Sequence, residues 1–252
     1  MCVVALTYNT HPDWPLLLIG NRDEFHARPT APLARWGGAR ESGHHIIAGR
    51  DLESGGSWLG VSEQGRVAVV TNIRSDTPPA PDKSSRGALV ADYLAGAGKY
   101  KKLKKNQIGE LNPFHLFTLD SAGSALHSAN LPEPKQRKVG NGILGLSNAE
   151  ADADWPRKDR LEAQLAHWLA HDARNFDALF DQLRSEERGE SESLPNFLDG
   201  DIYGTRCSTI IAVNPSGQGR IIERRFGVNG QGAGDSEFVF DWPSGRSKKG
   251  AE

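Results

Sequence analysis

Short apolar runs lie at both ends of the chain, and helical spacing occurs only between them. Cys2–Thr7 and Leu16–Gly20 flank the turn-rich "NTHPDW", and "RCSTIIAV", "RIIERRF" and "EFVF" follow near the C-terminus. Runs of this length that are bounded by turn residues predict β-strands. We therefore expect an α+β fold in which the N- and C-terminal strands meet in one antiparallel sheet covered by helices.

Two further hairpins and three helices are predicted between these ends. "SWLGVSEQGRVAVVTN" and "PFHLFTLDSAGSALHSAN" each hold a glycine-containing turn between apolar runs. "SSRGALVADYLAG", "DWPRKDRLEAQLAHWLAHD" and "NFDALFDQLRS" repeat apolar residues at helical spacing. The polar breaks are short and lie inside this pattern. We expect one domain over residues 1–243 and a disordered tail over 244–252.

The composition excludes several classes of function. A net charge of −2 gives no general attraction to nucleic acid. The longest aliphatic run, Leu16–Ile19, is far shorter than the roughly 20 residues that cross a bilayer. No signal peptide is apparent, and Cys2 and Cys207 alone make no disulfide framework. These features favour a cytoplasmic protein that does not span a membrane, and they leave its oligomeric state open.

Cys2 stands directly behind the initiator methionine. Removal of Met1 would place an α-amine and a thiol on one residue, so that the amine accepts the thiol proton and one residue supplies both base and nucleophile. Free cysteine also packs as a small apolar residue at the start of a strand. Position alone leaves both interpretations open.

Polar residues at predicted strand ends favour the catalytic interpretation. Asn21, Arg22, Asp23 and Glu24 follow the second strand, whose far end returns beside Cys2 if the two strands pair through their turn. Carboxylates there could hold the α-amine, and a guanidinium could stabilise a thiolate.

Three more polar residues flank predicted strands. Asn72 and Asn148 end two of them, where a side-chain amide can donate to a developing oxyanion, although asparagine is also a common turn former. Arg206 precedes the strand "CSTII", where it could bind a substrate carboxylate or stabilise a thiolate.

Other patterns do not support a nucleotide or a catalytic metal. "GNGILG" at 140–145 matches a dinucleotide fingerprint, but it does not join an apolar strand to a helix. His167 and His171 are four residues apart on a predicted helix, but no third metal ligand is evident. We expect neither cofactor.

Ordered motifs along most of the chain resemble one family. These are "MCVVAL", "NRDEF", "GGSWLGVSEQG", "VVTN", "SRGALV", "GLSN", "DWPRKDR" and "YGTRCSTII", and they are similar to the NRDE family, whose eukaryotic members are called transport and Golgi organization protein 2. The resemblance implies a four-layer αββα sandwich of antiparallel sheets. This is the N-terminal-nucleophile hydrolase fold of penicillin V acylases and bile-salt hydrolases.

The same resemblance implies roles for the polar residues. Cys2 would be the nucleophile, Asn72 and Asn148 the oxyanion donors, and Arg206 the late arginine of the site. Arg22 is a further catalytic candidate. Either Asp23 or Glu24 could take the place of the aspartate found in the amidases, because the spacing differs in this chain.

The function attributed to the family is haem trafficking, that is, non-covalent binding and transfer of haem as cargo. Thiolate and imidazole are the usual side-chain ligands of haem iron, so the ligand candidates are Cys2, His26, His44 and His45. The alternative is an N-terminal cysteine hydrolase that cleaves a small amide or thioester. In both cases the partner is a small molecule.

Overall fold

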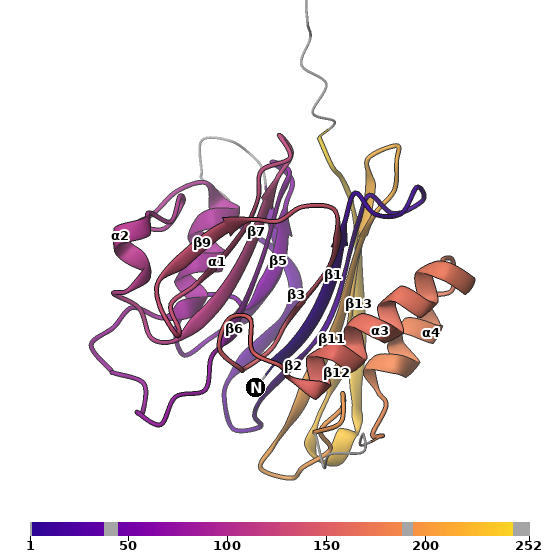
Figure 1. Ribbon diagram of the computed structural model, residues 1–252. Coiled ribbons are helices and arrows are strands. Elements are labelled where there is room, and N and C mark those ends of the chain that lie inside the picture. Colours follow the sequence, from indigo (N-terminus) through magenta and orange to yellow (C-terminus); the bar gives the residue numbers. More distant parts are fainter. Residues whose placement is uncertain (1, 38–44, 188–193, 244–252) are drawn as a thin grey trace, which may run out of the picture.

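Two antiparallel sheets lie face to face, and helices cover their outer faces (Figure 1). The computed structural model describes residues 2–37, 45–187 and 194–243. The first sheet has the strand order β10 (Gly142–Leu146), β1 (Cys2–Tyr8), β2 (Leu16–Phe25), β11 (Tyr203–Val213), β12 (Gln218–Phe226) and β13 (Gly232–Asp241). As expected, strands from both ends of the chain therefore share one sheet.

The second sheet is built from the intervening chain. Its order is β3 (Thr30–Gly37), β4 (His45–Asp51), β5 (Leu59–Ser62), β6 (Arg66–Asn72), β7 (Phe114–Asp120), β8 (Ala125–Ala129) and β9 (Lys135–Lys138). The two predicted hairpins, β5–β6 and β7–β8, are confirmed. The pairs β3–β4 and β8–β9 were not predicted.

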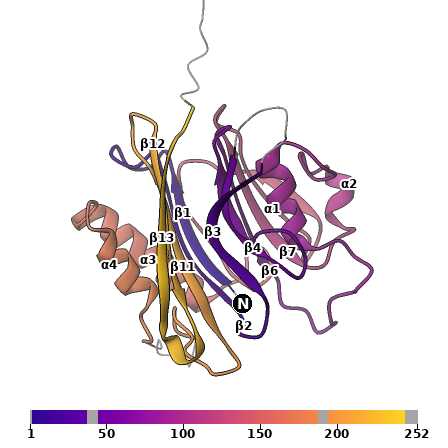
Figure 2. The same ribbon diagram turned by 180° about the vertical axis from the view of Figure 1, so that it is seen from behind.

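Helices close the two outer faces of the sandwich, as the view from behind also shows (Figure 2). α1 (Arg86–Ala95) and the short α2 (Lys105–Ile108) lie beside the second sheet, and α3 (Pro156–His171) and α4 (Phe176–Leu183) lie beside the first. A short 3₁₀ turn, Val228–Gly230, precedes β13. The three predicted helices are confirmed, and the layers are helix, sheet, sheet, helix.

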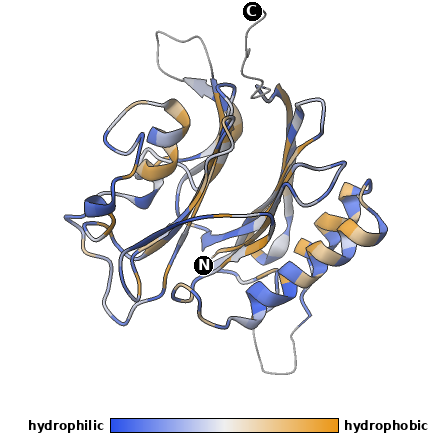
Figure 3. Cartoon of the chain, turned by 45° about the horizontal axis from the view of Figure 1, so that its top comes forward, coloured by the Kyte–Doolittle hydropathy of each residue, from blue (hydrophilic) through white to orange (hydrophobic). Residues whose placement is uncertain are grey.

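Three apolar clusters fill the spaces between these four layers. One lies between the sheets and includes Val4, Leu18, Val69 and Phe117. A second joins β1, β2 and β11 to α3 and α4, and a third joins the second sheet to α1. Hydrophobic residues accordingly occur along the strands and in the helices that pack on them (Figure 3). Burial on both faces explains why these strands read as nearly continuous apolar runs.

β2 is longer than the sequence indicated, and this corrects one prediction. Asn21–Glu24 do not follow the strand but lie within it, because β2 continues to Phe25. Its pairing with β1 is as expected, with Cys2 opposite Arg22. Successive side chains of a strand point to opposite faces. The polar run is therefore divided between the two faces of the first sheet.

Asn21 and Asp23 lie on the face covered by α3 and α4. Asp23 is fully buried and accepts a hydrogen bond of 2.6 Å from Arg157 Nη1, in the first turn of α3, and one of 2.8 Å from Thr205. Asn21 Nδ2 donates to the carbonyl groups of Leu183 and Asn196, each at 2.7 Å. Both residues thus fasten β2 to α3, to the end of α4 and to the segment that follows it.

Replacing Arg157 with Met should destabilise the fold by about 3–5 kcal/mol, because it removes the guanidinium from the buried Asp23 carboxylate. Urea unfolding of the variant and of wild type measures the difference. Lys158→Met is the matched control, since Lys158 pairs at the surface with Asp159 and should change stability by less than about 1 kcal/mol. Equal losses in the two variants would contradict the assigned role of the buried pair.

Candidate active site

Cys2 opens the inner strand β1 at one end of the sandwich. It shares its face with Val4 and Leu6, which pack between the two sheets, so its thiol also points into the space between them. Arg22 lies directly opposite on β2, and Cys207 of β11 lies opposite Arg22 in turn. The Cys2 side chain is only partly buried, whereas Cys207 is buried. Cys2 is therefore the accessible thiol of this row.

One asparagine binds the backbone of Cys2, and a second asparagine binds the first. Asn148 Oδ1 accepts a hydrogen bond of 3.0 Å from the Cys2 nitrogen. Asn148 Nδ2 donates to Asn72 at both the backbone oxygen, 2.7 Å, and Oδ1, 3.1 Å. Asn148 is 1% exposed and its amide is committed to these contacts. Asn72 is more exposed, its Oδ1 is held by Asn148, and it lines the cavity beside Cys2.

The segment that carries Asn148 is held from several sides. Thr71 Oγ1 donates to the Ser147 carbonyl at 2.7 Å, and the Arg74 nitrogen donates to the Asn148 carbonyl at 2.7 Å. His115 Nε2 donates to the Ala149 carbonyl at 2.7 Å. These contacts tie the end of β10 to β6 and β7, so they fix Asn148 relative to Asn72.

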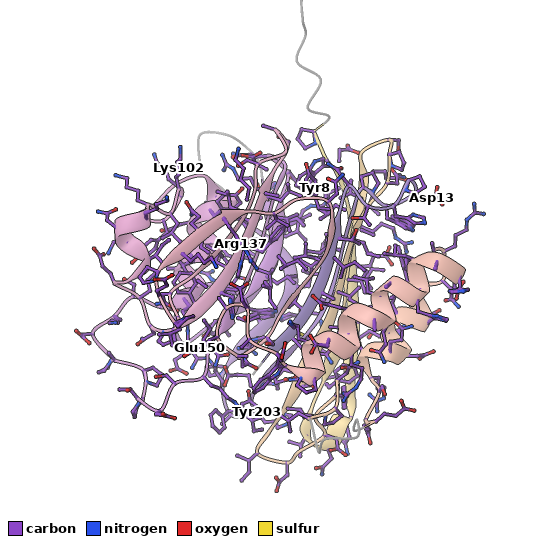
Figure 4. The ribbon with its side chains drawn as sticks, viewed as in Figure 1. Tyr8, Asp13, Lys102, Arg137, Glu150 and Tyr203 are labelled. Atoms are coloured by element: carbon purple, nitrogen blue, oxygen red, sulfur yellow. The ribbon has the colours of Figure 1, made fainter. Side chains whose placement is uncertain are left out.

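His115 belongs to a buried histidine pair behind this segment. Its Nδ1 lies 3.1 Å from His127 Nε2, and His127 Nδ1 accepts from Arg137 Nε at 3.3 Å; Arg137 is labelled in Figure 4. The carbonyl of Ala149 requires a proton on His115 Nε2, so the hydrogen bonds are satisfied with both rings neutral. Burial lowers the pKa of His115, and burial together with His115 and Arg137 lowers the pKa of His127 to about 3.

A cavity of about 400 Å³ opens beside Cys2. Arg22, Trp58 and Asn72 line it together with Glu24 and the segment before α1. The Arg22 guanidinium lies 4.3 Å from the centre of the Trp58 ring, a cation–π contact. The Trp58 ring occupies the space that a side chain at Gly49 of β4 would fill, so this close approach requires the glycine.

The N-terminus of α1 also faces this cavity. Ser85 caps it by accepting from the Gly87 nitrogen at 3.2 Å, and Ser84, Ser85 and Arg86 line the cavity. Gly56 packs so closely against the Gly87 backbone that any Cβ there would collide with it. The motifs "GGSW" and "SRGALV" therefore meet in space and place the positive end of the helix dipole beside the site.

Of the other predicted site residues, Asp23 and Glu24 line this cavity and Arg206 does not. Arg206 is outside the Cys2 cavity, where its Nη1 donates to the carbonyl groups of Phe25, His26 and Arg28 and so holds the turn between β2 and β3. The side chain of Asp23 faces Arg157, while Glu24 shares the face of Arg22. The hydroxyl of Tyr203, labelled in Figure 4, donates to the Asp23 carbonyl at 2.8 Å.

The histidine candidates do not converge on Cys2. His26 Nε2 bonds the Gly200 carbonyl at 3.0 Å, and the exposed His45 bonds Glu63. His44 lies outside the described residues. Within the described ranges, no group of three or more His, Cys, Asp or Glu is arranged to hold a metal ion, and no helix is long and apolar enough to cross a membrane.

Trp58, Arg86 and His115 were not predicted as parts of this region. Trp58 and Arg86 belong to the motifs "GGSWLG" and "SRGALV", which carry the family resemblance but gave no sign of a place at the site. His115 had no signal in the sequence, because its partner at Ala149 is distant along the chain.

The four-layer fold defines the class of architecture, which is that of the N-terminal-nucleophile hydrolases. It aligns with an N-acylethanolamine-hydrolyzing acid amidase ortholog of Caenorhabditis elegans over 83% of this chain and 92% of the other, with a TM-score of 0.50 and 9% identity. A penicillin V acylase from Agrobacterium tumefaciens aligns over 99% and 90%, with a TM-score of 0.49 and 13% identity. At such identities the likeness concerns the fold alone.

The chain belongs to the Transport and Golgi organisation 2 family, whose model matches residues 1–227. Transport and Golgi organization protein 2 of Drosophila melanogaster is 35% identical over 267 aligned residues, which cover 88% of this chain and 91% of the relative. The family and the fold expected from the sequence motifs are therefore confirmed.

The neutral histidine pair should make the protein sensitive to acid. An unfolded histidine binds a proton below about pH 6.5, whereas folded His127 remains neutral down to about pH 3. Unfolding free energy should therefore fall with decreasing pH across this window, by about 1.4 kcal/mol per pH unit for each such histidine. Denaturant unfolding at several pH values measures the slope.

His127→Gln keeps a donor and an acceptor but does not titrate, so its stability should fall less steeply between about pH 6 and 4. The exposed His171→Gln is the matched control and should keep the slope of wild type. If wild type and His127→Gln lose stability in parallel, the neutral pair is not responsible.

Proposed function

We propose that the protein is a cysteine hydrolase that cleaves an amide or thioester of a small molecule once Met1 has been removed. The observation that carries this proposal is the contact of Asn148 with the Cys2 nitrogen and with Asn72. Through this contact the Cys2 nitrogen, which would become the α-amine, and the Asn72 amide are connected by Asn148. Cys2 and Asn72 line the same cavity.

The chemistry follows the order of these groups. The Cys2 α-amine takes the thiol proton as Sγ attacks the substrate carbonyl carbon. Nδ2 of Asn72 donates to the oxygen as it becomes negative, and Asn148 keeps the amine and the Asn72 amide in position. The amine then returns the proton to the leaving amine or thiol. Water cleaves the resulting thioester on Cys2, which releases an acid and restores the thiol.

Cys2→Ala should reduce amide or thioester turnover by about 10³-fold or more, because the nucleophile is lost. A panel of chromogenic amides and thioesters measures the activity, and Cys207→Ala should retain it because Cys207 lies outside the proposed chemistry. Intact mass must show that Met1 is absent from active protein. Retention of Met1, or equal turnover by Cys2→Ala and wild type, would overturn the proposal.

Haem binding and transfer is a second proposal. It is supported by the position of Cys2 in the lining of the cavity. Among the described candidates, His26 and His45 lie apart from it, which leaves Cys2 as the thiolate ligand for iron. We expect haem titration to give a saturable Soret shift that Cys2→Ala abolishes and His26→Ala preserves. The absence of saturation in wild type, or an unchanged shift in Cys2→Ala, would contradict this proposal.

We also propose a cytoplasmic location. Both functions require a free thiol at Cys2, and a reducing compartment keeps thiols free. Microscopy of a C-terminally tagged chain tests this location without blocking the N-terminal cysteine.

A further inference from the structure

Arg22 is a buried guanidinium that makes no hydrogen bond with the described part of the chain. Its side chain is 5% exposed, and Nη1 is enclosed without a partner among those residues. Glu24 Oε2 lies 3.8 Å from Nη2, which is beyond hydrogen-bond distance. Arginine carries five N–H donors, and buried donors in proteins are normally paired. The donors of Arg22 are thus suited to an acceptor on a ligand.

The position of Arg22 puts such an acceptor next to the thiol. Cys2 and Arg22 are directly paired across β1 and β2, and side chains at paired positions on one face are close neighbours. Both residues line the same cavity. Trp58 covers one face of the guanidinium, which confines an acceptor to its edge, where the N–H groups point.

The other basic side chains of the cavity already contact carboxylates or carbonyl groups. Arg28 is neutralised by Asp51 at 2.9 Å and Glu53 at 3.2 Å. In the described chain, Arg86 Nη1 bonds a carbonyl oxygen, that of Pro113 at 3.0 Å, and Lys83 bonds the carbonyl of Leu111 at 3.4 Å. Neither contact cancels a positive charge. Glu24 is the carboxylate that faces Arg22, and its Oε1 accepts from the Phe25 nitrogen.

We propose that Arg22 selects the substrate by binding a carboxylate located within a few atoms of the carbonyl that Cys2 attacks. The planar guanidinium matches a carboxylate with two parallel N–H···O bonds. The substrate class is therefore a small amide or thioester whose acyl part carries an acid group. The reaction part of this inference depends on the proposed function, whereas the binding part depends on Arg22 and Cys2 alone.

Alkylation of Cys2 tests the binding part without any turnover. Iodoacetate and iodoacetamide react with the same thiolate and differ in one group, a carboxylate in place of an amide. The ratio of their rate constants at Cys2, followed by peptide mass, cancels the thiolate fraction. We expect this ratio to be at least about tenfold higher in wild type than in Arg22→Gln, which corresponds to one charged hydrogen-bond contact.

Two controls separate binding from general electrostatics and from misfolding. Arg28→Gln removes the same charge from the same cavity and should keep the ratio of wild type, because Arg28 is already paired. In wild type at constant ionic strength, acetate should slow the reaction of iodoacetamide with Cys2, and acetamide should not. This second measurement requires no variant.

If the ratio of the iodoacetate and iodoacetamide rate constants is the same in wild type, Arg22→Gln and Arg28→Gln, the inference is overturned. Arg22 would then serve only to pack against Trp58. A similar decrease of this ratio in both variants would also overturn the inference. The preference for iodoacetate would then come from the overall positive charge of the cavity. Failure of the proposed function has a different signature, because Cys2→Ala would then leave turnover unchanged whatever the alkylation ratios are.

Discussion

The alternation of side chains along β2 is the constraint on which the rest of the structure depends. Asn21 and Asp23 point to the helical layer and fasten it through Arg157 and backbone carbonyl groups. Arg22 and Glu24 point to the space between the sheets and reach the cavity. A shift of register by one residue would exchange these two pairs and bury Arg22 under α3. Fold and site therefore share the same four positions.

The site itself is a junction of strand ends that are distant in sequence. Cys2 begins β1, Asn72 ends β6, and Asn148 follows β10, so both sheets contribute to one hydrogen-bonded group. The two carboxamides, which the sequence motifs predict to act alike as oxyanion donors, differ in their surroundings. Asn148 is enclosed and orients its neighbours, whereas Asn72 is open to the cavity. The different burial of the two asparagines gives them different roles, because only an exposed donor can contact a ligand.

The sequence predicted local pairing well and distant partners poorly. The turn "NTHPDW" was enough to predict that Cys2 lies beside the Asn21–Glu24 run, because the position of a turn fixes the register of its hairpin. The partner of Asp23 could not be found in this way, since Arg157 is brought to it only by packing of α3. The turn held by Arg206 and the contact of Trp58 with Arg22 likewise depend on tertiary packing.

β1 pairs with β10 and β2, and β2 pairs with β11. These pairings determine when, during synthesis of the chain, the surroundings of Cys2 can form. Cys2 emerges from the ribosome first, but Asn148 follows more than a hundred residues later, and the strand that completes the neighbourhood of β2 ends at Val213. Cys2 is therefore translated long before the asparagine that binds its nitrogen. The surroundings of Cys2 are complete only when the last third of the polypeptide has been made.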